Sequence, residues 1–254
     1  MIEIKTLGGE KKKIDKSKIK LIAMDLDGTL TQHKQPLDAE HKRALDALSK
    51  RYKLLMVGAG QARRIFNQME AYPIDIIGNY GLQYAVYNKD KKDIDILRDE
   101  IFETNKEEIE SKVTYFREKY NFSEYRGENV EYHSSGCITF PILGTKAIQE
   151  DKLAFDPDRK KRRLIYNEVL EAFSDYNVFV GGSSSFDMSP KPYNKYYALE
   201  LYCKENGINH ESVVYIGDDY GYGGNDESIY NSDFNYLTID NYEDFPVIIK
   251  PLVY

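Results

Sequence analysis

The sequence predicts an α/β protein, with a Rossmann-like, doubly wound parallel sheet as its core and an inserted α+β cap domain. Buried-strand and amphipathic-helix patterns alternate in the first and last parts of the chain, as they do in parallel sheets with right-handed crossovers. Between these parts the chain is richer in Lys, Glu and Tyr, and its strand patterns are short. A length of 254 residues accommodates a core and a smaller second domain. We therefore expect residues 1–83 and 188–254 to form the core and residues 84–187 to form the cap.

The first part of the chain begins with a strand at Ile19–Met24, which is apolar enough to be buried on both faces, as parallel strands are. Asp38 is a suitable N-cap for a helix. Apolar residues at Ala44, Leu45 and Leu48 then follow the spacing of one helical face. The next elements are a strand at Tyr52–Val57, a helix at Gln61–Met69 and a strand at Ile74–Ile77.

The middle part carries two helix-start signals. Thr104-Asn-Lys-Glu107 has the pattern of a capping box, and Asp156-Pro157 pairs a cap residue with a first-turn proline. Short strands are expected at Val130–His133, Cys137–Phe140, Val178–Val180 and Ser185–Met188. Helices and short strands in this mixture predict a small α+β unit.

The alternating pattern then resumes in the last part of the chain. We expect a helix from about Tyr193 to Gly207, a strand at Val213–Ile216, a short helix near Asn225–Tyr230 and a strand at Asn235–Ile239. These elements would return the chain to the sheet that the first part began.

Composition excludes several classes of protein. A formal net charge of -7 opposes broad contact with a nucleic-acid backbone, so we expect no nucleic-acid partner. No segment reaches the ~18 consecutive apolar residues of a membrane span, and the Lys-rich start has no signal-peptide pattern, so we expect a cytoplasmic protein without membrane contact. Cys137 and Cys203 are expected to be two buried thiols rather than a disulfide.

Acidic residues follow two of the expected strands. Asp25 and Asp27 come directly after one strand, and Asp218 follows another, at the sheet edge where open α/β folds bind ligands. Carboxylates ~4 Å apart repel by about 4 kcal/mol at an effective dielectric of ~20, so such a cluster calls for a cation or a shared proton. The Asp25–Asp27 segment or the Asp218 segment alone is also typical of a solvated turn. Their joint occurrence favours an oxygen-rich Mg²⁺ site.

These acidic segments, together with Lys195, resemble the motifs of the haloacid dehalogenase superfamily. Asp25-Leu-Asp-Gly-Thr-Leu-Thr31 is similar to its nucleophile loop, Lys195 to its basic residue, and Gly217-Asp218 with Asn225-Asp226 to its acidic metal loop. The cap position is similar to the type IIB branch. Further details look most like eukaryotic-type phosphomannomutases: Leu30-Thr-Gln-His-Lys34, Arg126-Gly127 with Glu131-Tyr132, Gly181-Gly182 with Ser185-Phe-Asp187, and Gly223-Gly-Asn-Asp226.

The resemblance implies a phosphoryl-transfer site. Asp25 would be the nucleophile that forms an aspartyl-phosphate, and Asp27 would act as general acid and then base. Lys195 would neutralise the charge that builds up between carboxylate and phosphate; the alternative is an exposed lysine at a helix end. Magnesium would be held by Asp25, the Asp27 backbone carbonyl and Asp218, with Asn225 and Asp226 orienting the metal waters or Lys195.

The second motif of this family normally carries a Ser or Thr hydroxyl that binds the phosphoryl oxygens. Here the strand ends in Val57-Gly-Ala-Gly-Gln61, which has no hydroxyl. Backbone N–H groups of this Gly-rich turn at a helix start could take its place, because that geometry favours anions. The loss of one donor predicts a slower enzyme, and an inactive enzyme is the alternative.

The cap also departs from the mutases, whose arginines grip a distal phosphate. Of these arginines the chain keeps Arg126, and the other three positions are His133, Thr145 beside Lys146, and Lys152. Lys binds phosphate as a point charge and His is only partly charged, so the clamp is weakened; solvated charges are the alternative. The remaining substrate-site candidates are Lys34, where the family has an Arg, and Ser185 and Asp187, which the resemblance assigns to sugar hydroxyls unless their strand faces solvent.

These observations lead to one leading hypothesis and two alternatives. The leading hypothesis is a Mg²⁺-dependent phosphohydrolase acting on a sugar phosphate or a similar small phosphate monoester through Asp25. A weakened clamp favours it, because a mutase must retain its bisphosphate intermediate whereas a phosphatase need only admit water. The alternatives are a phosphomannomutase-like phosphotransferase and a catalytically weak sugar-phosphate-binding module. The resemblance also suggests a homodimer.

Overall fold

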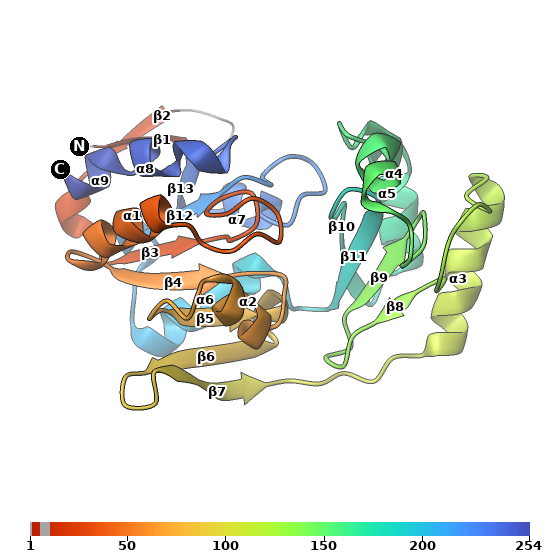
Figure 1. The fold of residues 1–254 in the computed structure, drawn as a ribbon, viewed down its shortest axis with the longest axis horizontal. Helices are drawn as coiled ribbons and strands as arrows, with labels where there is room; N and C mark the ends of the chain where they lie inside the picture. Colours follow the sequence, from red (N-terminus) through yellow and green to blue (C-terminus); the bar gives the residue numbers. More distant parts are fainter. Residues whose placement is uncertain (1, 6–10) are drawn as a thin grey trace. The chain divides into compact units, whose positions relative to one another are not determined.

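The computed structural model describes residues 2–5 and 11–254, and these fall into two compact units (Figure 1). The first unit covers the chain up to Asp99 together with Asn194–Gly221 and Asp226–Tyr254. The second unit covers Glu100–Tyr193 and Tyr222–Asn225. The chain therefore leaves the first unit and returns to it.

The unit boundaries differ from those expected at residues 84 and 187. Strands β6 (Gln83–Asn88) and β7 (Asp93–Asp99) pair antiparallel with each other, and β6 pairs with β5 (Asp75–Gly78), so they extend the sheet of the first unit. At the other end, β11 (Ser185–Pro190) pairs with β10 (Tyr176–Phe179) as far as Pro190. The change in composition near residue 84 therefore marked an edge hairpin and not a domain boundary.

The first unit contains a mixed sheet of nine strands in the order β2-β1-β13-β12-β3-β4-β5-β6-β7. Its centre, from β13 to β5, is parallel, which confirms the expected α/β class. Its edges are antiparallel, which the expectation of a purely parallel sheet did not include. The remaining strands of this sheet are β1 (Ile2–Lys5), β2 (Lys11–Ile14), β3 (Leu21–Met24), β4 (Lys53–Val57), β12 (Val213–Gly217) and β13 (Asn235–Thr238).

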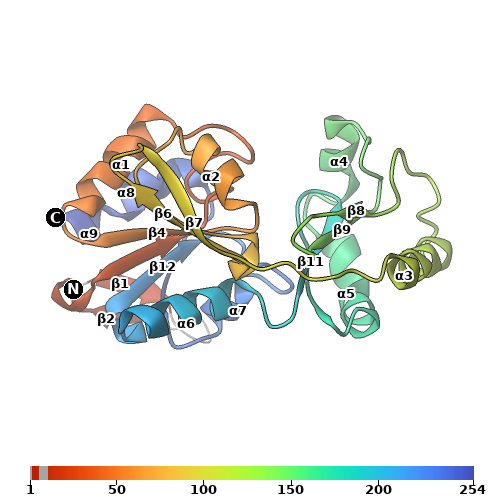
Figure 2. The same ribbon diagram turned by 90° about the horizontal axis from the view of Figure 1, so that it is seen from below.

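Helices cover both faces of this sheet (Figure 2). Strand β3 shows why: Ile22 and Met24 pack into one apolar cluster, whereas Leu21 and Ala23 pack into another on the opposite face. The first cluster includes residues of α1, α2, α8 and α9, and the second includes residues of α6 and α7. The helices are α1 (Ala39–Ser49), α2 (Ala62–Gln68), α6 (Lys195–Asn206), α7 (Glu227–Tyr230), α8 (Phe245–Ile248) and α9 (Lys250–Val253), with 3-10 turns at Lys16–Lys18, Asn79–Gly81, His210–Ser212 and Tyr242–Asp244.

The N-cap predicted at Asp38 is present. Its carboxylate accepts hydrogen bonds from the backbone N–H groups of Glu40 and His41, each at 2.9 Å. These bonds satisfy two donors that the first helical turn leaves without a partner, so the start of α1 is determined by local chemistry.

The second unit is an α+β arrangement with its own apolar core. Its antiparallel sheet has the order β10-β11-β9-β8. Phe140 and Phe186, on neighbouring strands, stack at a ring-centroid distance of 6.1 Å within that core. The elements not yet given are β8 (Glu131–Tyr132), β9 (Ile138–Pro141), α3 (Lys106–Lys119), α4 (Gln149–Phe155) and α5 (Lys160–Ala172).

Both helix-start signals of this unit are shifted. The N-cap of α3 is Asn105 and not Thr104, since the Asn105 side chain accepts from Glu108 N. Helix α5 begins at Lys160 and not at Asp156, and the Asp156 carboxylate accepts hydrogen bonds from the backbone N–H groups of Lys161 and Arg162 and from Arg162 Nε, the last at 2.9 Å. Asp156 therefore caps the first turn of α5 from four residues before the helix begins.

Two simpler expectations can be compared with the described residues. Cys137 and Cys203 are both buried free thiols. No helix within residues 2–5 and 11–254 is long and apolar enough to cross a membrane.

Candidate active site

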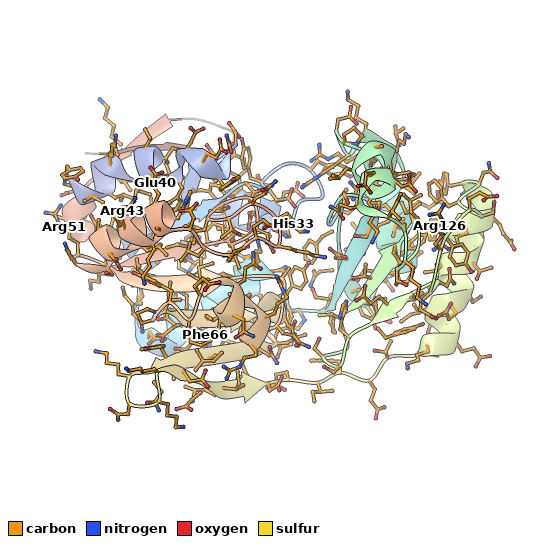
Figure 3. All side chains as sticks on the ribbon, in the orientation of Figure 1. His33, Glu40, Arg43, Arg51, Phe66 and Arg126 are labelled. Carbon is orange, nitrogen blue, oxygen red and sulfur yellow. The ribbon has the colours of Figure 1, made fainter. Side chains whose placement is uncertain are left out.

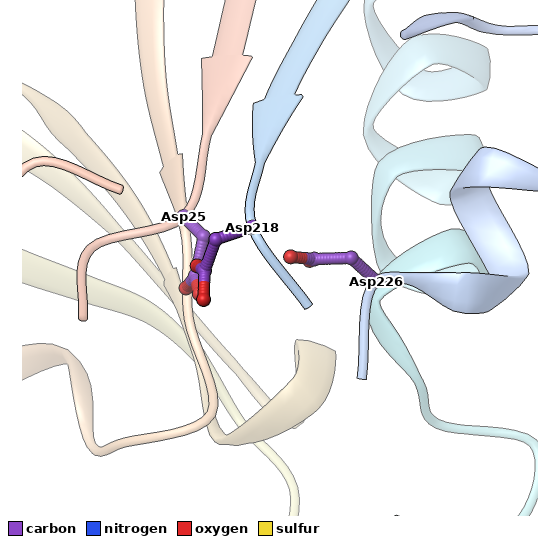
Figure 4. A group of neighbouring side chains, drawn as sticks. All are labelled: Asp25, Asp218 and Asp226. Atoms are coloured by element: carbon purple, nitrogen blue, oxygen red, sulfur yellow. The ribbon is translucent and has the colours of Figure 1, made fainter. Parts of the chain in front are cut away.

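The ends of two adjacent parallel strands bring two carboxylates together. Asp25 follows β3 and Asp218 follows β12, and these strands pair with Met24 opposite Ile216. Asp25 N donates a hydrogen bond to Ile216 O at 3.0 Å, which continues the pairing past the strand ends. Figure 4 shows the two carboxylates side by side, with Asp226 directed toward them from the start of α7. One carboxylate oxygen of each of these three aspartates lies within 4.8 Å of the others.

Lys195 lies against this cluster and is 0% exposed. Its Nζ atom is 2.9 Å from Asp25 Oδ1 and 2.8 Å from Asp226 Oδ1. Asn194 caps α6 by accepting from Tyr197 N, so Lys195 is the first residue of that helix. Burial opposes the charge on Lys195, but the two carboxylates outweigh burial and raise its pKa. The site therefore contains a fixed positive charge, and the alternative of an exposed helix-end lysine is wrong.

Asp226 is fully engaged by protein groups. Besides the ion pair with Lys195, its Oδ1 accepts from the Tyr215 hydroxyl at 2.6 Å and its Oδ2 accepts from Asp219 N at 3.2 Å. These contacts suit a residue that holds Lys195 in place better than one that binds a metal directly. The preceding residue, Asn225, is half-buried and is the last residue of the second unit.

Asp218 is held close to the nucleophile loop. Its Oδ1 accepts a hydrogen bond from Thr29 Oγ1 at 2.9 Å. A Cβ atom at Gly28 would lie 2.4 Å from Asp218 Oδ2, and Gly28 has φ +95°, so both space and backbone conformation require glycine here. Sequence reasoning did not assign a role to Thr29, although its place in the DGT turn was a usable signal.

The acidic cluster fits a divalent cation. Burial, together with the neighbouring carboxylates, raises the pKa of Asp25 well above its usual range. Burial and Asp226 raise the pKa of Asp218 to about 7. The carboxylates of buried Asp25 and half-buried Asp218 are both difficult to ionise in this setting. They form an oxygen donor set whose charged form a hard cation such as Mg²⁺ would stabilise.

We predict that this cluster destabilises the cation-free protein at neutral pH. The pKa of Asp218 is raised to about 7 in the folded state, whereas an unfolded aspartate has a pKa of about 3.9. The protonated Asp218 carboxyl group therefore contributes its full stabilisation below about pH 4, and this stabilisation is lost as the pH rises through about 7. In EDTA, the Tm of the wild type is expected to fall more steeply from pH 5 to pH 8 than that of Asp218→Asn.

Calorimetry with and without Mg²⁺ checks this expectation. Magnesium should restore the Tm of the wild type at pH 8 and leave that of Asp218→Asn unchanged. Asp90→Asn, an exposed carboxylate in the β6–β7 turn, is the matched control and should behave like the wild type. Equal pH slopes and equal Mg²⁺ responses in all three proteins would contradict the cation site.

Asp27 is held by a different set of contacts. Its Oδ1 accepts from Lys34 N and from Gln68 Nε2, both at 2.7 Å. Its Oδ2 lies 3.4 Å from an Arg64 guanidinium nitrogen. Burial raises the pKa of Asp27, but the hydrogen bonds from Gln68 and Lys34 outweigh burial and lower it. The backbone of Lys34, rather than its exposed side chain, makes the recorded contact with this site.

One N–H group of the Gly-rich turn after β4 and one at the helix start that follows it are already engaged. Gly58 N donates to Ile77 O at 2.9 Å, and Ala62 N, at the start of α2, donates to Gln83 Oε1 at 2.9 Å. The turn therefore offers fewer backbone donors to an anion than the sequence suggested.

In the second unit, Ser185 and Asp187 belong to a polar cluster on the sheet. Asp187 Oδ1 accepts from Thr139 Oγ1 at 2.9 Å and from Ser185 Oγ at 3.3 Å. His133 Nε2 is 3.2 Å from Thr139 Oγ1. Burial raises the pKa of Asp187. Thr139, which pairs in register with Asp187, is the member of this cluster that the sequence analysis missed.

Arg162, which is 0% exposed, binds the backbone next to that cluster. Its guanidinium donates to the backbone oxygens of Gly181 and Ser185, the second at 2.9 Å, while its Nε binds Asp156. A Cβ at Gly181 would lie 1.8 Å from Asp187 Oδ2. The buried Asp156–Arg162 pair therefore fixes the Gly-Gly turn around Asp187, a role that the sequence did not reveal.

The other candidates of the second unit lie on a loop and on helix α4, which carries Lys152. Arg126 is exposed (Figure 3), and its guanidinium is 4.0 Å from Asp151 Oδ2. Lys146 N donates to Arg126 O, and Lys152 Nζ is 3.5 Å from Thr145 O. These contacts join His133 to Asp187 through Thr139, and they join Arg126 and Lys152 to the loop that carries Thr145 and Lys146.

Comparison with known proteins agrees with this architecture. The chain matches the haloacid dehalogenase-like hydrolase family over residues 22–228, and it belongs to that family. It is 25% identical over 238 residues to a phosphomannomutase of Encephalitozoon cuniculi, covering 88% of this chain and 90% of the relative. It is 28% identical over 223 residues to a phosphomannomutase of Nicotiana benthamiana, covering 84% and 86%. These matches confirm the resemblance drawn from the sequence.

Solved structures share the fold. An IMP-bound IMP-nucleotidase mutant of Plasmodium falciparum has a TM-score of 0.66 at 15% identity, covering 92% of this chain and 68% of that chain. A haloacid dehalogenase-like hydrolase of B. subtilis has a TM-score of 0.57 at 17% identity, covering 91% and 93%. Identities this low establish the architecture alone.

Proposed function

We propose that the protein is a Mg²⁺-dependent phosphohydrolase that acts on a sugar phosphate or a similar small phosphate monoester. The observation that carries this proposal is the buried group Asp25–Lys195–Asp226. Asp25 is 6% exposed and lies at a strand end, with a lysine ammonium 2.9 Å away. Such an arrangement suits a carboxylate nucleophile that must approach a negatively charged phosphate, because the ammonium offsets their repulsion.

In the first half-reaction an Asp25 oxygen attacks phosphorus. The Oδ–P bond forms as the bond from phosphorus to the ester oxygen breaks, and Asp27 gives its proton to that departing oxygen. Asp27 can hold this proton once the hydrogen bonds from Gln68 and Lys34 are released, because burial alone raises its pKa. The products are an aspartyl-phosphate, the free alcohol and the Asp27 carboxylate.

In the second half-reaction water attacks the same phosphorus atom. Asp27 takes a proton from the water, the Oδ–P bond breaks, and inorganic phosphate leaves. Asp25 is restored as a carboxylate and Asp27 as an acid. Lys195 stays paired with Asp226 throughout, so its charge stays in place while charge shifts between Asp25 and phosphate.

Asp25, Asp218 and the backbone carbonyl of Asp27 would hold the metal ion. When bound, Mg²⁺ supplies further neutralisation of the phosphoryl oxygens and of the acidic cluster. Thr29 would fix the Asp218 carboxylate through its 2.9 Å hydrogen bond.

A phosphomannomutase-like phosphotransferase is the second candidate, in which a sugar hydroxyl takes the place of water. The names of the relatives and the polar cluster around Asp187 favour it, since paired hydroxyl and carboxylate groups suit sugar hydroxyls. The exposed Arg126, next to Asp151, favours hydrolysis, because a partly neutralised surface arginine retains a bisphosphate poorly.

A phosphorus NMR time course separates these activities. The purified protein is incubated with Mg²⁺, mannose 1-phosphate and a trace of glucose 1,6-bisphosphate, with an EDTA sample as the control. We expect inorganic phosphate to accumulate in the magnesium sample only. Formation of mannose 6-phosphate would favour the mutase. Binding of mannose 1-phosphate, with no turnover of any phosphate monoester in a panel, would identify a binding module.

A further inference from the structure

An arginine side chain lies over the turn that lacks a hydroxyl. A Cβ atom at Gly60 would lie 2.2 Å from Arg64 NH2, 2.4 Å from its Nε and 2.6 Å from its Cζ. The guanidinium of Arg64 therefore fills the space that a side chain at residue 60 would occupy. Because Gly60 ends the turn after β4, and β4 pairs with β3, this guanidinium lies at the sheet edge that also carries Asp25.

The same guanidinium contacts the active-site loop. One terminal nitrogen of Arg64 is 3.4 Å from Asp27 Oδ2, and the other donates to Gln68 Oε1 at 2.7 Å. A guanidinium has five N–H donors, and these two contacts engage two of them. The contact with Asp27 is long, and the Arg64 side chain is 43% exposed, so the pair is weak and open to an incoming anion.

We propose that Arg64 binds the phosphoryl oxygens of the substrate in place of a side-chain hydroxyl at residue 60. Gly58 N in the turn and Ala62 N at the start of α2 are already engaged by Ile77 and Gln83, so neither of these two N–H groups is available to an anion. A guanidinium supplies both a fork of donors and a positive charge, which suits a phosphate dianion. This inference rests on the proposed function, because it assigns a phosphate contact to the same site.

The neighbouring residues offer a matched set of variants. Arg64→Ala removes the guanidinium, and Gly60→Ser adds a hydroxyl where the guanidinium lies. Gly60 does not have a positive φ, and the three nearest atoms to its Cβ belong to the flexible end of Arg64, so serine fits once Arg64 is truncated. Arg63→Ala is the control, because Arg63 is on the same helix but pairs with Asp93.

Two measurements test the proposal in the presence of Mg²⁺. The first is kcat/KM for p-nitrophenyl phosphate, and the second is the affinity for inorganic phosphate from phosphorus NMR line widths. Arg64→Ala is expected to lower both by about 10- to 100-fold, and Arg64→Ala/Gly60→Ser is expected to recover at least about tenfold of the loss. Arg63→Ala should match the wild type, and the magnesium-induced rise in Tm should be the same in all variants.

The outcomes distinguish this inference from the proposed function. Phosphate binding without turnover in the wild type would end the phosphohydrolase proposal, and a weaker affinity in Arg64→Ala would still support the phosphate contact. Unchanged kcat/KM and unchanged phosphate affinity in Arg64→Ala would overturn the inference alone. A loss that Gly60→Ser does not recover would also overturn it, since Arg64 would then act only by positioning Asp27. Absence of phosphate binding in the wild type would overturn both.

Discussion

Replacing Asp25 by Asn is expected to lower the turnover of a phosphate monoester by at least about a thousandfold. An amide is a far weaker nucleophile than a carboxylate, so the aspartyl-phosphate cannot form at a useful rate. The volume hardly changes, and Asn can still contact Lys195, whose Nζ is 2.9 Å from Asp25 Oδ1. Steady-state kinetics with p-nitrophenyl phosphate measure the loss, and circular dichroism measures whether the fold is kept.

Asp90→Asn is the matched control for this variant. Asp90 is an exposed aspartate of the same unit that lies in the β6–β7 turn, and its substitution should leave kcat/KM unchanged. Turnover by Asp25→Asn near that of the wild type would remove the nucleophile from the proposed mechanism. Loss of structure in that variant would instead show that the charge on Asp25 holds the strand ends together.

Replacing Lys195 by Ala is expected to have two large effects. Turnover should fall by at least about a thousandfold, because the charge opposite the phosphate is lost. Stability should fall as well, because Asp25 and Asp226 would be left as buried carboxylates without their common partner. Removing one partner of a buried pair costs about 3–5 kcal/mol, and we expect a loss of that order in the free energy of unfolding without Mg²⁺.

A second substitution separates the two effects. Lys195→Ala/Asp226→Asn removes one of the stranded charges, so it should regain part of the stability but none of the activity. Lys204→Ala, on the exposed end of the same helix, is the control and should change neither property. Recovery of turnover in the double variant would mean that Lys195 serves folding and not catalysis. Urea unfolding and phosphatase kinetics on the same samples provide both readouts.

Local sequence patterns determined the centre of the first unit. Strand β3 was predictable because its side chains are apolar at every position, which only a strand buried on both faces requires. The start of α1 was predictable because the Asp38 cap acts within one helical turn. The placement of Asp25 and Asp218 at one sheet edge followed from parallel pairing alone, since both residues follow strands of that kind.

Two other elements escaped prediction, for different reasons. The hairpin β6–β7 is partly exposed and polar, so its sequence resembles that of a small second domain until its pairing with β5 is known. Helix α5 begins later than its cap residue for a local reason, because the Asp156 carboxylate caps the N–H groups of Lys161 and Arg162 without being part of the helix. For the hairpin, a contact outside the local window outweighs local propensity.

The sequence by itself therefore determined the fold class, the acidic strand ends and the residue types needed for phosphoryl chemistry. Periodicity and turn composition indicate burial and local hydrogen bonding, and these properties depend on residues that are close together in the sequence. Only the tertiary structure decided that Lys195 is buried between two carboxylates, that Thr29 holds Asp218, and that Arg64 fills the space at Gly60. These relations depend on how far apart side chains lie after folding, and sequence spacing carries no information on that distance when the residues come from different elements.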